Sequence, residues 1–206
     1  MPMITKEEIA LKTHSLCRYF YSIMPIINVP SVIKNGILSF YKTRSISHTS
    51  VALTTVQERR EQVIIPNAGK LHSYANLYFT YHNPMMYKRR NEAESLCVLA
   101  IDLNVLEIPG CILSDRNAAA DLVRFYSPED GFNEINFNLV YAQSWIDTDN
   151  FYSPKKAIKC AEILVPNCVP YKYILGAYVL DENSQKKLIN QGFDKKIVIQ
   201  RSVFFR

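Results

Sequence analysis

Short apolar runs alternate with polar, turn-forming stretches along most of the sequence. Runs of about four to eight residues that are rich in β-branched and aromatic side chains are typical of β-strands. The pattern therefore predicts strands at 19–24, 74–81, 95–102, 160–165, 173–180 and 196–205, with a short strand pair around a bend at 105–113.

Fewer segments carry helical signals. Pro30 suits a first helical turn, and Gly36 is placed to end that helix. Thr55 and Glu58 match a capping box, in which each side chain caps the backbone of the other at the start of a helix. Further short helices are expected near residues 115–122 and 183–190, and residues 83–87 are expected to begin a helix or a turn.

The order of these elements indicates one α+β domain over residues 1–206. They do not alternate strand, helix and strand, which argues against a doubly wound parallel sheet. Residues 1–18 precede the first predicted strand and form an N-terminal extension. Residues 114–153 are expected to be a long irregular insertion, and such insertions are more often functional than accidental.

Composition excludes several classes of protein. The hydrophobic fraction of 48% and the charged fraction of 21% are ordinary for a globular domain. No stretch approaches the roughly 20 consecutive apolar residues of a membrane span. Lys6, Glu7 and Glu8 precede any apolar segment, so we expect neither secretion nor membrane insertion.

Cysteine and histidine spacing gives no sign of a disulfide or a metal site. The five cysteines form no CxxC pair, which favours free thiols in a reducing, cytoplasmic compartment. The four histidines share no ligand-like spacing with each other or with the cysteines, so no metal is expected.

The net charge of +5 is mild, but the basic residues gather in short groups such as 88–90 and 155–159. Thirteen tyrosines and ten phenylalanines are interspersed among them. Basic groups that alternate with aromatic residues suit single-stranded nucleic acid, because phosphate contacts and base stacking contribute separately. Solvated lysines together with core aromatics would give the same composition, so both interpretations stay open.

Glu162 is the most unusual residue of the pattern, because it interrupts an apolar run that Pro166 ends. An ionised carboxylate buried there without a partner would cost several kcal/mol. Two interpretations follow: either Glu162 faces water from an edge strand, or it lines a cleft and takes part in chemistry.

The common signatures of dinucleotide binding, phosphate binding and hydrolysis (GxGxxG, P-loop, GxSxG and HExxH) do not occur. A different series of motifs does occur. In chain order it comprises Asn28-x-Pro30-Ser31-x-Ile33-x-x-Gly36, Gln57-Glu58-Arg59-Arg60, Gly69-x-Leu71-His72-x-Tyr74, Tyr78-Phe79, Asn83-Pro84-Met85-Met86-Tyr87, Asp115-Arg116, Lys155-Lys156 and Ala161-Glu162-x-Leu164-Val165. Over residues 19–206 this series resembles the DarT family of DNA ADP-ribosyltransferase toxins.

The resemblance implies an ADP-ribosyltransferase-like fold, in which short antiparallel strands surround a central cleft, with few helices and a long target-binding loop region. It implies that NAD is cleaved at the nicotinamide bond and that ADP-ribose is placed on a thymine or guanine base of single-stranded DNA. It assigns catalysis to Glu162 with support from Arg60. A macrodomain protein that removes ADP-ribose would be the antitoxin partner.

The resemblance also implies two sets of binding residues. The NAD set is Ser22, Met24, Gly36, Arg44, His48, Tyr78 and Met85. The DNA set is Arg116, Asn117, Trp145, Lys155 and Lys156.

Two positions depart from the family pattern. Ser22 stands where relatives carry a histidine that binds NAD, and Asn117 stands where relatives can have a histidine. Serine can hydrogen-bond a ribose but cannot stack or become charged as histidine does. Transfer to RNA or protein and a non-catalytic binding module therefore remain alternatives, although a module without turnover would have no chemical need for both Arg60 and Glu162.

Overall fold

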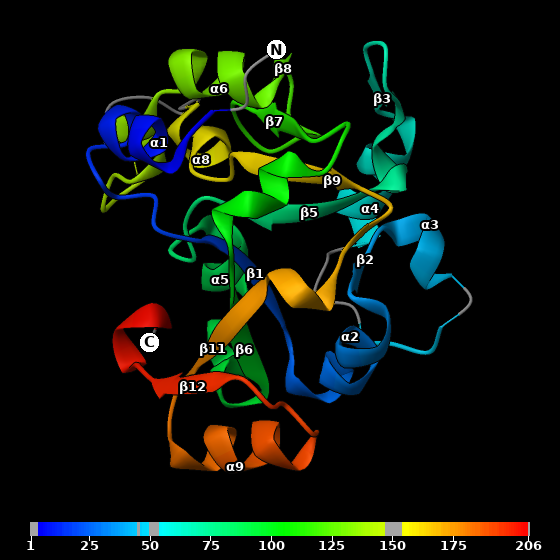
Figure 1. The fold of residues 1–206 in the computed structure, drawn as a ribbon, viewed down its shortest axis with the longest axis vertical. Helices are drawn as coiled ribbons and strands as arrows, with labels where there is room; N and C mark the ends of the chain where they lie inside the picture. The colour runs from blue at the N-terminus through cyan, green and yellow to red at the C-terminus, as the bar shows by residue number, and fades with distance from the viewer. Residues whose placement is uncertain (1–3, 45, 50–53, 147–153, 206) are drawn as a thin grey trace.

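An eight-stranded sheet forms the centre of the fold (Figure 1). The computed structural model describes residues 4–44, 46–49, 54–146 and 154–205. The strand order is β12-β11-β6-β1-β5-β9-β7-β8, and neighbours are antiparallel except for β11 and β12. The strands of this sheet are β1 (Phe20–Pro25), β5 (Tyr74–Tyr78), β6 (Leu96–Ile101), β7 (Ile112–Ser114), β8 (Phe125–Tyr126), β9 (Glu162–Pro166), β11 (Ile174–Val179) and β12 (Lys196–Ile199).

Two small ribbons and a set of mostly short helices surround this sheet. The ribbons are β2 (Ile37–Leu38) with β10 (Cys168–Val169), and β3 (Ile64–Ile65) with β4 (Gly69–Lys70). The α-helices are α1 (Lys6–Lys12), α2 (Val29–Asn35), α3 (Phe40–Thr43), α4 (Thr54–Gln62), α5 (Pro84–Lys88), α6 (Pro128–Glu134), α7 (Phe137–Val140), α8 (Lys155–Ile158) and α9 (Glu182–Asn190). The 3-10 helices are η1 (Ile26–Asn28), η2 (Leu71–Ser73), η3 (Arg90–Ser95), η4 (Leu103–Glu107), η5 (Tyr171–Tyr173) and η6 (Arg201–Val203).

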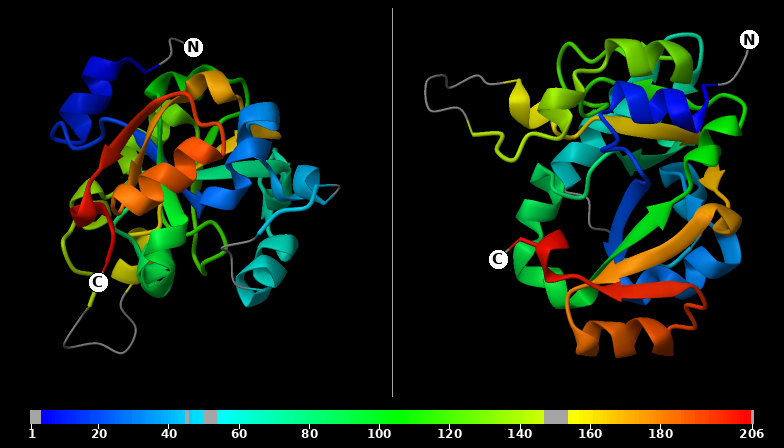
Figure 2. Two further views of the ribbon diagram at one scale, coloured as in Figure 1. Left: turned by 90° about the horizontal axis from the view of Figure 1, so that it is seen from below. Right: turned by 60° about the vertical axis from the view of Figure 1, so that its left-hand side comes forward.

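The sheet changes direction between β1 and β5. A single residue pair, Tyr21 opposite Tyr78, joins these two strands, whereas β1 pairs with β6 along its whole length. Figures 1 and 2 show that β1, β6 and β11 run at a steep angle to β5 and β9. The junction therefore brings side chains of the two halves together at Tyr21 and Tyr78.

The two faces of the sheet are buried by different elements. One face packs against apolar residues of α1, α2, α6, α7 and α9, including Ile9, Val29 and Leu188. Near the junction, the other face packs against α5, η3 and η6, with Met86 and Val203 completely buried. Because strand residues alternate between the faces, each strand position belongs to one of these two environments.

Most predicted strands and three of the predicted helices are confirmed, with ends shifted by a few residues. The strand predicted at 196–205 is only half confirmed, because β12 ends at Ile199 and the 3-10 helix η6 follows. Helix α2 has Pro30 in its first turn and ends at Gly36, as predicted. Helices α5 and α9 form where the pattern predicted them. Helix α4 also forms, but it already begins at Thr54, so Thr55 lies inside the helix and does not cap it.

Two predicted elements are wrong. The first half of 105–113 is the 3-10 helix η4, because the Asp102 side chain accepts the Asn104 N–H at 2.9 Å and caps it. The helix predicted at 115–122 is a series of turns. There the Asp115 carboxylate binds the Arg116 guanidinium and accepts the Arg124 N–H at 3.0 Å, which closes a loop instead of a helix.

The insertion predicted at 114–153 is not irregular over its described part, 114–146. It contains β8, α6 and α7, and the last two begin at side-chain caps, Ser127 and Asn136. Residues 147–153 of the predicted insertion lie outside the described residues. Within the predicted N-terminal extension, α1 buries Ile9 in the main core.

Candidate active site

Glu162 is the first residue of β9, an interior strand between β5 and β7. Its side chain is 0% exposed. The interpretation of Glu162 as a water-facing residue of an edge strand is therefore wrong. The carboxylate is buried, and it needs partners inside the protein.

Arg60 of α4 is the main partner of this carboxylate. Its Nη1 donates to Oε1 and Oε2 of Glu162 at 3.0 and 3.1 Å, and Arg60 is only 7% exposed. The Ala118 backbone N–H donates to Oε1 at 3.0 Å as well. Burial lowers the pKa of Arg60, but the Glu162 charge and its hydrogen bonds outweigh that effect, so the pKa lies above its ordinary value. The guanidinium is therefore charged where it meets the carboxylate.

Ser114, completely buried at the end of β7, binds the backbone of Glu162 and the backbone of the turn that carries Ala118. Its Oγ accepts the Glu162 N–H at 3.3 Å and donates to the Arg116 carbonyl at 2.7 Å. The turn that follows is fixed to α8, since the Asn117 N–H donates to the Ala157 carbonyl at 2.9 Å. Ser114 of β7 and Ala157 of α8 thus fix the turn that places the Ala118 N–H against Glu162. The sequence patterns gave no sign of this role for Ser114 or Ala118.

Four side chains form a row across the sheet beside this pair. Ser114 is opposite Glu162, Glu162 is opposite Tyr78, and Tyr78 is opposite Tyr21. Directly opposed residues of antiparallel strands point to the same face. Burial raises the pKa of Tyr78, and the Glu162 charge raises it further. The phenol beside the carboxylate is therefore neutral and able to donate a hydrogen bond.

Ser22 and Met24 lie on the other face of the sheet. They alternate with Tyr21 along β1, and Met24 packs in the main core with Phe20 and Leu99. Neither side chain is on the face that Glu162 shares with Tyr21, and their contact with NAD stays a prediction.

Met85 of α5 does lie near the row. It packs at the edge of the cluster that contains Tyr78 and Cys160, and a backbone hydrogen bond links Met85 to the Cys160 thiol. Burial raises the pKa of Cys160 to about 12, so this thiol two residues before Glu162 is neutral. Met85 and Tyr78 thus belong to one cluster, and their contact with NAD stays a prediction.

Arg44 and His48 are placed on the segment that follows α3. The Arg44 guanidinium lies 4.9 Å from the Tyr41 ring centroid and 3.6 Å from Glu61 Oε1, and the exposed His48 ring contacts the Ile46 carbonyl. These contacts do not include the Glu162 carboxylate. Gly36 has a backbone role, since its φ is +76° and a Cβ there would lie 2.3 Å from the Val169 carbonyl oxygen.

His72 was in none of the catalytic, NAD or DNA sets predicted from the sequence, but it lies close to Arg60. Its Nε2 is 3.1 Å from Gln57 Oε1, and its ring centroid is 4.1 Å from that of Phe40. Burial and the Arg60 charge lower the pKa of His72, so the ring is neutral. Within the described residues, its buried Nδ1 has no hydrogen-bond partner. The Leu71-His72-x-Tyr74 motif was the signal that could have identified it.

The residues expected to bind DNA are spread over two regions. Arg116 is paired with Asp115, and Asn117 caps the Ala119 N–H, so both stabilise the turn next to Glu162. Lys155 and Lys156 lie on α8, directly before β9. Trp145 lies against the rings of Tyr87 and Phe205.

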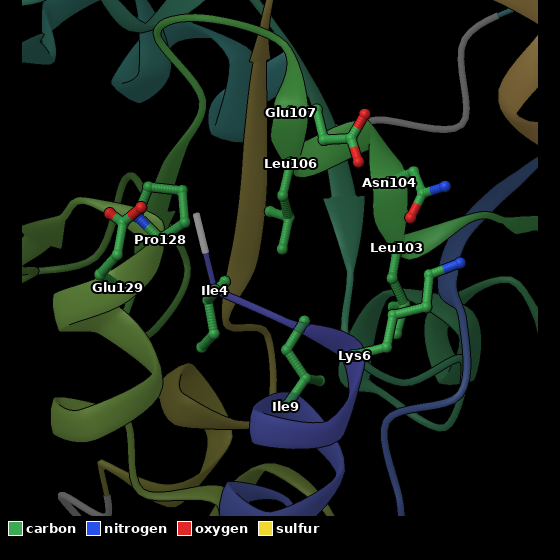
Figure 3. Close-up of a pocket in the computed structure, with 9 residues that line it drawn as sticks. All are labelled: Ile4, Lys6, Ile9, Leu103, Asn104, Leu106, Glu107, Pro128 and Glu129. Atoms are coloured by element: carbon green, nitrogen blue, oxygen red, sulfur yellow. The ribbon is translucent and has the colours of Figure 1, made fainter. Parts of the chain in front are cut away.

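Neither of two surface cavities coincides with the Glu162 site. One cavity, shown in Figure 3, has a volume of about 40 Å³ and lies between α1, η4 and α6. That volume suffices for very few water molecules. A second, open depression of about 470 Å³ lies over the start of α9 and carries both acidic and basic residues. No helix in the described ranges is long and apolar enough to cross a membrane.

Comparison with known proteins identifies relatives of this chain. Residues 21–205 match the family described as "ssDNA thymidine ADP-ribosyltransferase, DarT". A "DNA ADP-ribosyl transferase-DNA ADP-ribosyl glycohydrolase fusion protein" of Thermosipho africanus is 31% identical over 182 residues, which is 84% of this chain but 46% of that protein. A "DNA ADP-ribosyl transferase" of Thermus aquaticus is 26% identical over 180 residues, or 82% of this chain and 78% of that protein.

Solved structures give the same fold. The DarT of Thermus sp. 2.9, in complex with ADP-ribosylated single-stranded DNA, superimposes with a TM-score of 0.81 over 92% of this chain and 97% of that chain, at 20% identity. The DarTG of Thermosipho africanus in complex with ADP-ribose gives a TM-score of 0.78 over 91% of this chain and 51% of that chain, at 26% identity. The expected α+β, ADP-ribosyltransferase-like fold is thereby confirmed.

Proposed function

We propose that this chain, which belongs to the DarT family of single-stranded DNA thymidine ADP-ribosyltransferases, transfers ADP-ribose from NAD to thymine bases in single-stranded DNA. The observation that carries this proposal is the buried pair of Arg60 and Glu162 at the junction of the two half-sheets. A charged pair at the start of an interior strand serves no packing purpose that apolar residues would not serve as well. Its retention is explained by a chemical role.

The first step breaks the bond between the ribose C1′ and the nicotinamide nitrogen of NAD. The bonding electrons leave with the nicotinamide, which becomes neutral, and positive charge develops on the ribose ring. A carboxylate fixed beside that ring stabilises the developing charge, because its position costs no reorganisation during the reaction. We assign this role to Glu162, whose carboxylate is held by Arg60 and the Ala118 N–H and whose backbone N–H is held by Ser114.

The second step forms the bond between C1′ and a ring nitrogen of the thymine base. That nitrogen carries a proton, which must leave as the new bond forms. Glu162 is the proposed acceptor of this proton, after which solvent takes it up. The products are then nicotinamide, ADP-ribosylated DNA and one proton, and no further reactant is needed.

Arg60 is proposed to keep the carboxylate ionised and to orient it. Both residues are nearly inaccessible in the structure, and Nη1 of Arg60 is close to both carboxylate oxygens. Because the Glu162 carboxylate is buried, it must become accessible before a ribose hydroxyl can reach it. The neutral Tyr78 hydroxyl lies on the same face and is proposed to form part of the nicotinamide side of the pocket, together with Met85.

The remaining assignments have unequal support. Arg44 and His48 stay proposed NAD contacts on the segment after α3, and Gly36 is proposed to act through the backbone turn that it permits. The placement of Ser22 and Met24 on the opposite face does not support them as NAD contacts beside Glu162. Lys155, Lys156, Trp145, Arg116 and Asn117 are proposed to bind or position the DNA.

A partner is proposed from the architecture of one relative. The Thermosipho relative is named as a fusion with a DNA ADP-ribosyl glycohydrolase, and this chain spans about half of its length. An activity that removes ADP-ribose from DNA would reverse the proposed reaction. We therefore propose that this chain is the toxin of a cytoplasmic toxin-antitoxin pair, with a macrodomain protein of that activity as antitoxin.

The proposal is tested by incubating the protein with NAD labelled in its adenylate half and single-stranded DNA, RNA or a protein mixture. Label on thymine-containing DNA is expected, and none on an otherwise equal DNA in which cytosine replaces thymine. Label on guanine-containing DNA alone would overturn the choice of base. Label on RNA or protein alone would overturn DNA as substrate, and no label on any polymer would overturn the transferase assignment.

A further inference from the structure

A continuous series of aromatic rings leads away from the row that contains Glu162. Tyr21, opposite Tyr78 in that row, has its ring centroid 5.0 Å from Tyr81. Tyr81 is 4.9 Å from the His82 ring, which is 5.0 Å from Phe205. Aromatic pairs interact at centroid separations of about 4.5 to 7 Å, so each step of this series is a direct contact.

The series ends at a triangle of aromatic rings on the surface. Phe205 lies 5.4 Å from Tyr87 and 5.7 Å from Trp145, and Tyr87 lies 6.0 Å from Trp145. We call these three residues the aromatic platform. Tyr87 is 43% exposed, and the other two rings are half-buried. The three come from α5, the segment after α7 and the C-terminal residues after η6, and Figures 1 and 2 show α5 beside the C-terminal segment.

The surroundings of the aromatic platform are basic. The Arg90 guanidinium lies 4.4 Å from the Tyr87 ring centroid, and the exposed Lys88 follows Tyr87 directly on α5. Arg89 pairs with Glu92 at 2.8 Å, so this acidic neighbour already has a cationic partner. Partly exposed rings next to positive charge match a ligand that presents both bases and phosphates, which is single-stranded nucleic acid.

We propose that the aromatic platform of Tyr87, Trp145 and Phe205 is a stacking site for nucleotides that flank the target base. The DNA strand is then bound at two places, the row that contains Glu162 and the aromatic platform. This inference rests on the proposed function, and it deepens that function by naming a second DNA-binding site. Flanking bases stack on the rings, while Arg90 and Lys88 contact the phosphates between them. Stacking does not depend on base identity, so this site adds affinity for the strand without selecting the target.

Trp145 allows a direct test, because it is the only tryptophan of the chain. Titration of the wild-type protein with a thymidine oligonucleotide of about 15 nucleotides is expected to quench its fluorescence as a base stacks on the indole. An abasic oligonucleotide of the same length carries the phosphates without the bases. It is expected to cause much less quenching, and equal quenching by both would overturn stacking. Quenching by RNA but not by DNA would overturn DNA as the ligand.

A second test measures what DNA length adds to the reaction. The quantity is the ratio of kcat/KM for the 15-nucleotide substrate to kcat/KM for a trinucleotide with the same target base. Tyr87→Ala is expected to lower this ratio at least about fivefold, since removal of one stacked ring costs roughly that much or more. Tyr87→Phe keeps the ring and is expected to retain the wild-type ratio. Tyr126→Ala, which removes a half-buried ring of β8 at the opposite edge of the sheet, is the matched control.

The outcomes separate this inference from the function on which it rests. If Tyr87→Ala keeps the wild-type ratio, the stacking site is overturned even though transfer to DNA continues. If neither DNA is modified by the wild-type protein, the proposed function fails, and the fluorescence titration still decides whether bases stack on Trp145. If Tyr87→Phe lowers the ratio as much as Tyr87→Ala, the ring does not carry the effect and the inference is overturned.

Discussion

Arg60 and Glu162, which are 102 residues apart in sequence, meet through hydrogen bonds of 3.0 and 3.1 Å from one guanidinium nitrogen to both carboxylate oxygens. The pair joins α4 to the first residue of an interior strand, and both side chains are buried. Each charge offsets much of the cost of burying the other, and the Ala118 N–H adds a further hydrogen bond to the carboxylate. Stability and chemistry are therefore coupled at this point of the fold.

Removal of the arginine alone should destabilise the protein strongly. Arg60→Met leaves the Glu162 carboxylate buried without its cation, and we expect the free energy of unfolding to fall by about 3 to 5 kcal/mol. The double variant Arg60→Met, Glu162→Leu removes both charges and should recover a large part of that loss. Urea denaturation measures both values.

Arg59→Met is the control for this measurement. Arg59 is exposed on the same helix and donates to the Thr55 carbonyl, so its replacement should change stability by less than about 0.5 kcal/mol. If Arg60→Met were as stable as Arg59→Met, the pair would not be a buried ion pair in solution.

The burial of Lys159 leads us to expect that the free energy of unfolding depends on pH. Its side chain is 3% exposed and its Nζ donates to the Val140 and Ala142 carbonyls. Burial lowers the pKa of Lys159 to about 8 from an ordinary 10.5, and the neighbouring Cys160 opposes this only weakly. Between these two values the folded amine is neutral while the unfolded amine keeps its proton, so the stability contribution of Lys159 rises with pH.

The comparison with Lys159→Met isolates this effect from other titrating groups. Between pH 7 and pH 10.5 the wild-type protein should gain up to about 3 kcal/mol of unfolding free energy relative to Lys159→Met. Below pH 7 the difference between the two proteins should be constant, because the amine is charged in both states. A difference that stays constant from pH 7 to 10.5 would show that the folded pKa is not lowered.

DNA binding should depend on salt through the basic residues of α8. Each phosphate contact on a single strand adds about 0.7 to the slope of log affinity against log salt concentration. Lys156 is exposed on α8 near the start of β9, so Lys156→Ala should reduce that slope by about 0.7. NAD carries only two phosphates, and its affinity should fall less steeply with salt.

Lys186→Ala provides the matched control for this series, since Lys186 is an exposed lysine on α9. For Lys186→Ala, the slope of log DNA affinity against log salt concentration should equal that of the wild-type protein. If Lys186→Ala reduced the slope and Lys156→Ala did not, the proposal that DNA phosphates contact α8 would be wrong.

Much of the fold could be predicted from the sequence because local patterns dominate it. The strand at 95–102 is a continuous apolar run, and β6 is buried along its whole length. Gly36 ends α2 with a positive φ that other residues rarely adopt. These features are set by a few neighbouring residues, and tertiary contacts did not override them.

The errors arose where specific side-chain contacts, which no hydrophobic pattern shows, decide the structure. Asp115 opens no helix because it binds Arg116 and the Arg124 backbone. The roles of Ser114 and Ala118 depend on the pairing of β7 with β9, which no local pattern reveals. Ser22 was chosen by its position in a family motif; strand alternation places it on the face opposite Glu162, and its contact with NAD stays a prediction. For the candidate site, local chemistry identified Glu162, and only the fold showed what surrounds it.

The most direct test of the central claim is the rate of ADP-ribose transfer to single-stranded DNA by Glu162→Gln. Glutamine keeps the size and part of the hydrogen bonding of Glu162 but removes its charge. The control is Glu61→Gln, whose side chain is half exposed on the same helix as Arg60 and 3.6 Å from Arg44. The account predicts that Glu162→Gln lowers kcat at least about 100-fold, while Glu61→Gln stays near the wild-type rate. A folded Glu162→Gln protein that transfers ADP-ribose at a rate within a few-fold of the wild type would contradict it.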